Sequence, residues 1–237
     1  HRNLRIGGHY RLLVLHVERT VKLLACIPAF ALLAFCGLAP LEEASAPETM
    51  EQTSVKEESS LFTVDAQSRI FTFETNDKKY LGEREFTLWT VQGTNESDSF
   101  EPIEARLYKE SGRTEAGFGL VFCEQETGGR PFMLAVLINA NGYYTVGKVC
   151  DGVFGHINDG WKNSNYINKG HGIKNTIAVA YDAGTKNFLL KINGYEITSF
   201  TVSEQIAFKD SRSGFAVVIA DNENFPGKPV RVTFENK

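Results

Sequence analysis

The chain has 237 residues, of which 42% are hydrophobic and 11% aromatic, and its formal net charge at pH 7 is −4. That hydrophobic share can supply a core, which excludes a wholly disordered chain. The acidic balance excludes nucleic acid as a partner, because an acidic surface gains nothing from phosphate contacts.

The first element in chain order is an apolar segment between a lysine and a cysteine. Lys22 precedes an apolar run over residues 23–35, and Cys36 follows that run directly. The length of the run and its small residues are typical of a secretory signal, whereas a spanning helix needs about 20 apolar residues. The quartet Leu33-Ala34-Phe35-Cys36 resembles the lipobox of bacterial lipoproteins, with Phe35 in place of the usual small residue. The resemblance implies that Cys36 carries a lipid.

Two alternatives to lipidation stay open at this segment. The apolar run could remain as an uncleaved N-terminal anchor, or the signal could be cut after Ala44-Ser45-Ala46, with Pro47 directly beyond the cut. All three place the rest of the chain outside the cytoplasm, and the first two attach it to a membrane. We therefore expect a cell-envelope protein. Because a valine codon can start translation in bacteria, we interpret residues 1–20 as upstream sequence and 21–36 as the signal.

The next stretch is polar and acidic. Residues 41–60 carry six glutamates against the single Lys56. Such a segment cannot bury enough apolar surface to offset its chain entropy, so we interpret 37–60 as a flexible tether, with a short helix as the alternative. Residues 61–237 hold both tryptophans and 15 of the 17 phenylalanines, which predicts one domain of ordinary size.

The elements predicted within that domain are β-strands, because hydrophobic residues alternate there with a period of two. Asn-Gly pairs at 141–142 and 193–194 predict tight hairpins, since both residue types tolerate positive φ, and Gly128-Gly129 predicts another turn. One turn of helix is expected over 203–210, with Ser203 as its cap. We predict strands over residues 61–64, 70–74, 85–91, 103–109, 117–123, 133–140, 143–150, 176–181, 188–192, 215–219 and 230–234.

The domain contains two cysteines, Cys123 and Cys150. If the three strands between residues 117 and 150 form a meander, both cysteines lie opposite the same end of the middle strand. Neighbouring strands are about 4.8 Å apart, so strands on either side of a third are roughly 10 Å apart. A disulfide needs Cα atoms within about 7 Å. We therefore predict two unpaired cysteines that behave as small buried hydrophobic residues.

The strand and turn motifs resemble the concanavalin-A/laminin-G-like jelly rolls of bacterial surface proteins over residues 61–237. The family fold is a two-sheet antiparallel sandwich with adjacent first and last strands, so the resemblance implies an all-β jelly roll. Members include sugar-binding modules, glycosidases and adhesion modules, which leaves the function open. The motifs that carry the resemblance are 117–122, 141–148, Trp161 with Ser164, Ile167 and Gly170, then Asn175, 188–194 and 230–234.

Residues for catalysis are scarce in this domain. Glycosidases of this fold carry carboxylates on alternate residues of one strand, and retaining hydrolysis needs two of them about 5 Å apart. Glu83 and Glu85 have that spacing but lack the third carboxylate of the motif. His156 and His171 have no partner at zinc-ligand spacing and are interpreted as solvent-facing or turn residues. We predict a protein without enzymatic activity, with a glycosidase as the alternative.

The run Asp221-Asn222-Glu223-Asn224 is rich in oxygen atoms. Calcium takes six to eight oxygen ligands, so Asp221 and Glu223 are the calcium candidates. A plain turn is the alternative, because Pro226 and Gly227 follow directly. No other cofactor is predicted.

Residues 154–166 have the composition of a sugar site. Sugars stack their apolar faces on aromatic rings while their hydroxyls need polar partners, and such sites combine a few polar groups with an apolar surface. Trp161 and Tyr166 would supply the rings, with Asn158, Asp159 and Asn163 as polar partners. We predict a glycan ligand at this segment, and an extracellular protein bound through a sheet is the alternative partner. A structural role for Trp161, capping the core, is also open.

Overall fold

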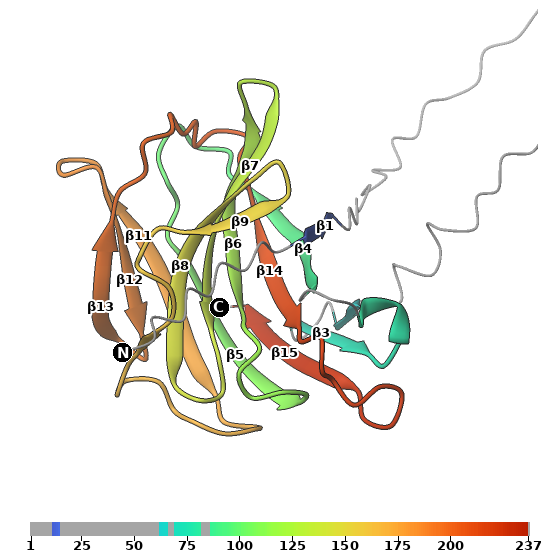
Figure 1. The fold of residues 1–237 in the computed structure, drawn as a ribbon. Helices are drawn as coiled ribbons and strands as arrows, with labels where there is room; N and C mark the ends of the chain where they lie inside the picture. The colour runs from blue at the N-terminus through green and yellow to red at the C-terminus, as the bar shows by residue number, and fades with distance from the viewer. Residues whose placement is uncertain (1–10, 15–61, 66–68, 82–85, 237) are drawn as a thin grey trace, which may run out of the picture.

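A computed structural model of the chain describes residues 11–14, 62–65, 69–81 and 86–236 (Figure 1). The signal with Cys36, the acidic tether and the Glu83/Glu85 pair lie outside the described residues. Within the described part, no helix is both long enough and apolar enough to cross a membrane.

The larger of two sheets has eight strands, all antiparallel to their neighbours except β1, which runs parallel to β4. β1 belongs to the segment that we interpret as upstream sequence. In spatial order the strands are β10 (Lys162–Asn163), β8 (Tyr143–Cys150), β7 (Arg130–Ile138), β6 (Phe118–Thr127), β14 (Arg212–Ile219), β4 (Phe86–Thr94), β1 (Arg11–Val14) and β9 (Val153–His156).

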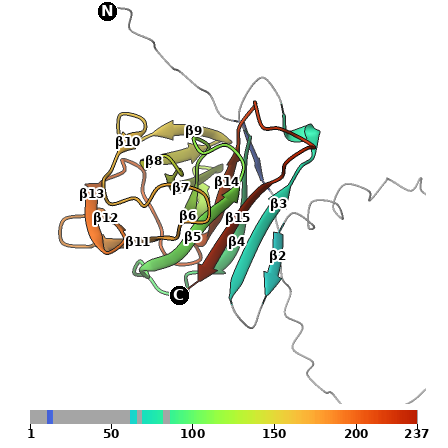
Figure 2. The same cartoon turned by 90° about the horizontal axis from the view of Figure 1, so that it is seen from below.

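The smaller sheet faces the larger one and is antiparallel throughout (Figure 2). Its order is β13 (Tyr195–Phe200), β12 (Asn187–Ile192), β11 (Asn175–Asp182), β5 (Ile103–Ser111), β15 (Val230–Asn236), β3 (Ile70–Thr75) and β2 (Phe62–Asp65).

Consecutive strands lie in different sheets after β1, β3, β4, β5, β10, β13 and β14. As expected for a jelly roll, strands from the two ends of the domain are neighbours, because β15 pairs with β3 from Val230↔Thr75 to Glu235↔Ile70. The predicted all-β, two-sheet antiparallel jelly-roll sandwich is therefore confirmed. The predicted strands and the three predicted turns are confirmed as well, and Asn193 and Gly194 have φ of 52° and 85°.

The period-two alternation places one set of side chains between the sheets. Phe118, Leu120 and Phe122 of β6 enter this core with Phe188, which is 1% exposed, from the smaller sheet. Across the layers, the rings of Phe215 and Phe234 stack with centroids 4.4 Å apart. Aromatic pairs of this kind add roughly 0.5–1.5 kcal/mol beyond the area that they bury.

The helical turn predicted over 203–210 is wrong. Those residues form an irregular segment in which Ile206 and Phe208, two residues apart, pack against the core. The Ala207 backbone N–H donates to Oε1 of Gln125 at 3.2 Å instead of to a helical carbonyl. A short 3₁₀ helix forms elsewhere, at Lys78–Tyr80, where the side chain of Asp77 caps it.

The outer face of the larger sheet carries a second apolar cluster, made of Val121, Met133, Ala135, Leu137, Val149, Ala216 and Val218. Each of these residues is at most 4% exposed. β9 pairs with β8 along one side and with β1 at Val153, so it bridges over this face (Figure 1). Phe154 and Trp161 pack against the cluster. The outer face is therefore a second small core.

Cys123 and Cys150 are both unpaired, as predicted. β7 lies between their strands, with Cys150 opposite Phe132. Cys123 is buried, and burial raises the pKa of its thiol to about 12. Cys150 is only half-buried, so the expectation of a buried residue is met fully at Cys123 alone.

The close approach of β6 and β7 at Gly119 can be tested by substitution. A Cβ at this position would overlap the carbonyl oxygen of Val136 on β7, whereas a Cβ at Gly155 has open space around it. We expect Gly119→Ala to lower the free energy of unfolding by about 3 kcal/mol, because the backbone must move to accept the methyl group. Urea unfolding measures this, with Gly155→Ala as the control; equal midpoints for the two variants would contradict the close approach.

Candidate functional site

A groove of about 340 Å³ opens at one flank of the sandwich, where the edges of the two sheets approach each other. Its lining residues come from β10, β8 and the loop after β10 on one side, and from β13 of the smaller sheet on the other. Figure 2 shows β10 and β13 on the same flank of the sandwich. The volume of the groove lies at the lower end of the range for small-molecule sites, roughly 300–1,000 Å³. The lining residues are Tyr144, Asn163, Ser164, Asn165, Tyr166, Glu196 and Ile197.

Two tyrosines form an exposed aromatic surface at this groove. Tyr166 lines it, and Tyr195 stacks on Tyr166 with ring centroids 4.4 Å apart and planes 22° apart. The two residues remain 48% and 56% exposed. Large aromatic side chains are usually buried in a core, so a stacked pair that remains exposed marks a surface that a ligand could contact.

The loop that carries Tyr166 is held by an amide network. Nδ2 of Asn193 donates to the Tyr166 carbonyl at 2.7 Å and to Oδ1 of Asn175 at 2.8 Å. Asn175 is buried, and its side chain exchanges hydrogen bonds with the backbone of Asn168. Ser164 Oγ accepts from the Tyr166 N–H at 3.2 Å. The tyrosine therefore sits on a preformed loop, which reduces the entropy lost on binding.

Polar groups of several kinds reach the groove. Asn163 and Asn165 are exposed and supply amides, and Glu196 supplies an exposed carboxylate. Tyr144 is 7% exposed, and burial raises the pKa of its hydroxyl, which stays neutral. The groove thus combines a ring surface with hydrogen-bond donors and acceptors.

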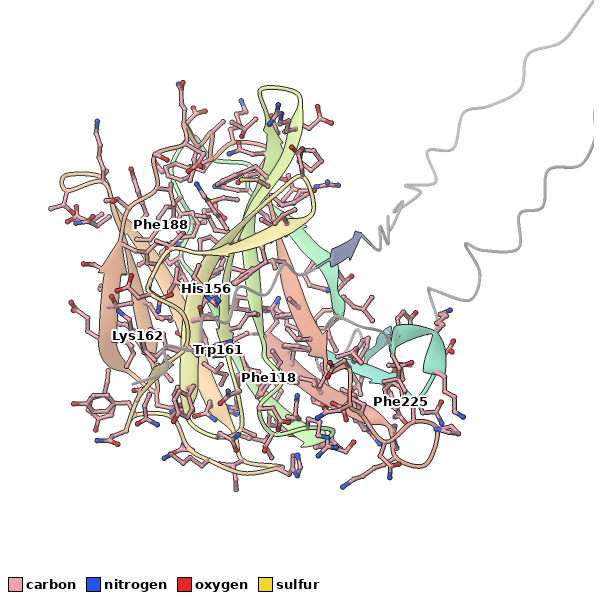
Figure 3. All side chains as sticks on the ribbon, in the orientation of Figure 1. Phe118, His156, Trp161, Lys162, Phe188 and Phe225 are labelled. Carbon is pink, nitrogen blue, oxygen red and sulfur yellow. The ribbon has the colours of Figure 1, made fainter. Side chains whose placement is uncertain are left out.

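The structure divides the five residues predicted from sequence between two places. Asn163 and Tyr166 belong to the groove. Trp161, labelled in Figure 3, packs on the outer-face cluster. A Cβ at Gly117 would lie 2.8 Å from its ring. Asn158 Oδ1 accepts from the Val146 N–H at 2.8 Å, which ties it to β8. Asp159 is exposed on the loop that connects the two places.

Three polar residues meet on the outer face near Trp161. Thr145 Oγ1 lies 2.7 Å from Nδ1 of His156 and donates to Asn158 Oδ1 at 3.3 Å. His156 is exposed as a residue, but partial burial of its ring lowers its pKa, so the imidazole is neutral at pH 7. His171, also exposed, has Nε2 at 2.8 Å from the Gly112 carbonyl.

The calcium candidates form a turn in which Glu223 already has a partner. Both oxygens of its buried carboxylate accept from the Arg113 N–H, at 2.8 and 3.1 Å. Asp221 is exposed. Across the described residues, no group of three or more His, Cys, Asp or Glu side chains is placed to hold a metal. The carboxylate of Glu223 therefore joins the β5–β6 turn to the β14–β15 loop.

Sequence reasoning missed the half of the groove that comes from the smaller sheet. Tyr195 and Glu196 are about 30 residues from Tyr166 along the chain, and only the packing of the two edges brings them together. A signal was present in the sequence, because Tyr195 directly follows the Asn193-Gly194 hairpin turn, which predicts a second strand beginning at that residue.

No family model matches the sequence, and no curated protein matches it. Among solved structures the chain is similar to carbohydrate-binding module CBM66 from Bacillus subtilis, with 10% identity over 74% of this chain and 88% of that one, and a TM-score of 0.43. Bacillus licheniformis β-glucanase has 10% identity over 74% and 80%, with a TM-score of 0.48. The Emp46p carbohydrate recognition domain has 13% identity over 80% and 94%, with a TM-score of 0.41. Scores this low support neither a ligand nor an activity.

Asn193 tests whether the amide network holds the site. Asn193→Gly keeps the turn's positive φ but removes the hydrogen bonds to Tyr166, Asn175 and Thr176. We expect the free energy of unfolding to fall by about 1–3 kcal/mol, with faster amide exchange in the Tyr166 loop. Lys186→Gly is the matched control, since Lys186 also has positive φ but lies in the exposed β11–β12 turn. Unchanged exchange in Asn193→Gly would show that the loop is held by other contacts.

Proposed function

We propose that this chain is an exported, membrane-anchored protein whose jelly-roll domain binds glycan without catalysis, at the groove between β10 and β13. The observation that carries the proposal is the exposed Tyr166–Tyr195 stack beside a groove lined by amides and a carboxylate. A sugar ring has apolar C–H faces for the tyrosine rings and hydroxyl groups for Asn163, Asn165 and Glu196. Sites of this kind pair an aromatic surface with a few placed polar groups.

The arrangement of carboxylates supports binding without hydrolysis. Retaining glycosidases need two carboxyl groups about 5 Å apart, and inverting enzymes need two about 6.5–9.5 Å apart. Among the described residues that line the groove, Glu196 is the single carboxylate. One carboxylate can accept hydrogen bonds from a sugar but cannot serve as both acid and base.

The location proposed for this domain rests on the N-terminal sequence. Lys22, the apolar run over 23–35 and the Leu33–Cys36 quartet have the layout of a lipoprotein signal. From Cys36 onward the chain holds 20 Lys and Arg against 28 Asp and Glu, a net charge near −8. A lipid at Cys36 would hold the domain at the membrane through the acidic tether, with the groove free to meet glycans outside the cytoplasm.

The tyrosine stack gives the main test of glycan binding. On a broad glycan panel we expect the full chain to bind, and Tyr166→Ala and Tyr195→Ala each to weaken affinity on the order of tenfold, because each removes an aromatic contact surface. Tyr143→Ala is the matched control, since Tyr143 is 38% exposed and does not line the groove. Absence of binding to every glycan would overturn the proposal. An equal loss of glycan affinity in all three variants would show that the binding site does not lie at the groove.

The anchor is tested separately by lipid labelling. When the chain is expressed in a bacterium supplied with labelled palmitate, we expect the wild type to incorporate label and Cys36→Ser to lose it, because the thiol is the attachment atom. Cys26→Ser, within the same apolar run, should retain the label. An unlabelled wild-type protein would contradict lipidation and leave glycan binding unaffected.

A further inference from the structure

The groove holds one charged side chain, and its position depends on an irregularity in the strand pairing. β13 pairs with β12 through Glu196↔Lys191 and then through Thr198↔Leu190, so Ile197 is an extra residue opposite the Leu190/Lys191 step. Consecutive strand residues normally point to opposite faces, but a bulge of this kind re-aims side chains. As a result, the neighbours Glu196 and Ile197 both line the groove.

The carboxylate of Glu196 is the single charged group among the residues that line the groove; Lys191, its register partner on β12, is exposed and is not part of the lining. Of the ion pairs formed by the residues that the structure describes, none includes Glu196. The other lining residues are neutral: Tyr144, Asn163, Ser164, Asn165, Tyr166 and Ile197. The raised pKa of the Tyr144 hydroxyl keeps that residue uncharged. Lys162 on β10 is exposed and is not part of the lining.

We infer that Glu196 makes the groove selective for uncharged sugars and excludes uronic acids and other anionic glycans; this inference rests on the glycan-binding function proposed above. A carboxylate accepts hydrogen bonds from hydroxyl groups, and such charge-assisted bonds are roughly twice as strong as neutral ones. A second carboxylate on the ligand can donate nothing to Glu196 and is repelled by it. The same side chain therefore favours one class of sugar and disfavours the other.

The repulsion has a recognisable dependence on salt. Two unit charges a few ångströms apart near a protein surface interact strongly enough to change affinity on the order of tenfold. Salt screens exposed charges, with a Debye length of about 8 Å at physiological ionic strength and about 3 Å at 1 M. Discrimination against anionic sugars should therefore weaken as salt is added, whereas binding of neutral sugars should change little.

The test uses the full chain and a panel of matched pairs, namely glucose and galactose oligosaccharides and their glucuronate and galacturonate counterparts. We expect the neutral member of each bound pair to bind on the order of tenfold more tightly. Glu196→Gln should weaken the neutral sugars several-fold, strengthen the uronates, and abolish the salt dependence of the difference. Glu196→Asp, which keeps the charge, should still discriminate.

The control for net charge is Glu126→Gln, because Glu126 is exposed on β6 and is not part of the groove. It removes one negative charge from the chain and should leave the preference unchanged. If uronates bind as well as their neutral counterparts, or if Glu126→Gln alters selectivity as much as Glu196→Gln, the inference is overturned while glycan binding stands. If no member of any pair binds, the proposed function fails, and the inference fails with it.

Discussion

The structure depends on the burial of alternate side chains between two facing sheets. The long strands of both sheets contribute alternate residues to one shared core, and the stacked rings of Phe215 and Phe234 join the last two strands across the layers. Burial of this apolar surface is the dominant favourable term in folding, at roughly 25 cal/mol per Å². A sandwich held in this way has faces that pack and edges that do not close.

The unclosed edges explain where the groove lies. β10 has only two residues and β13 carries a bulge, so the two edge strands leave space between them instead of continuing the core. Short and bulged edge strands also resist pairing with other chains. The Asn193–Asn175 network then ties the loop that carries Tyr166 to the smaller sheet.

The outer face of the larger sheet follows a different principle. Small residues at Gly117 and Gly147 allow the Trp161 and Phe154 rings to lie directly on the sheet. With β9 bridging above, the apolar side chains on this face are almost completely removed from solvent. The half-buried Trp161 ring packs on this face and stabilises the fold, whereas the more exposed ring surface is the one formed by Tyr166 and Tyr195 at the edge.

The sequence by itself determined eleven of the strands, the turns and the class of fold, because these depend on local alternation and on the φ preferences of Gly and Asn. It did not predict β1, β9, β10 or β13. It also indicated correctly that Cys123 and Cys150 do not pair, since strand spacing sets their separation. It did not show that Trp161 and Tyr166, which are five residues apart in the chain, lie on different surfaces of the domain. The sequence also did not show that Tyr166 lies beside Tyr195 and Glu196, or that residues 203–210 form no helix. Those features depend on which edges meet and which side chains find space against the core, and only the packing of the two sheets decides that.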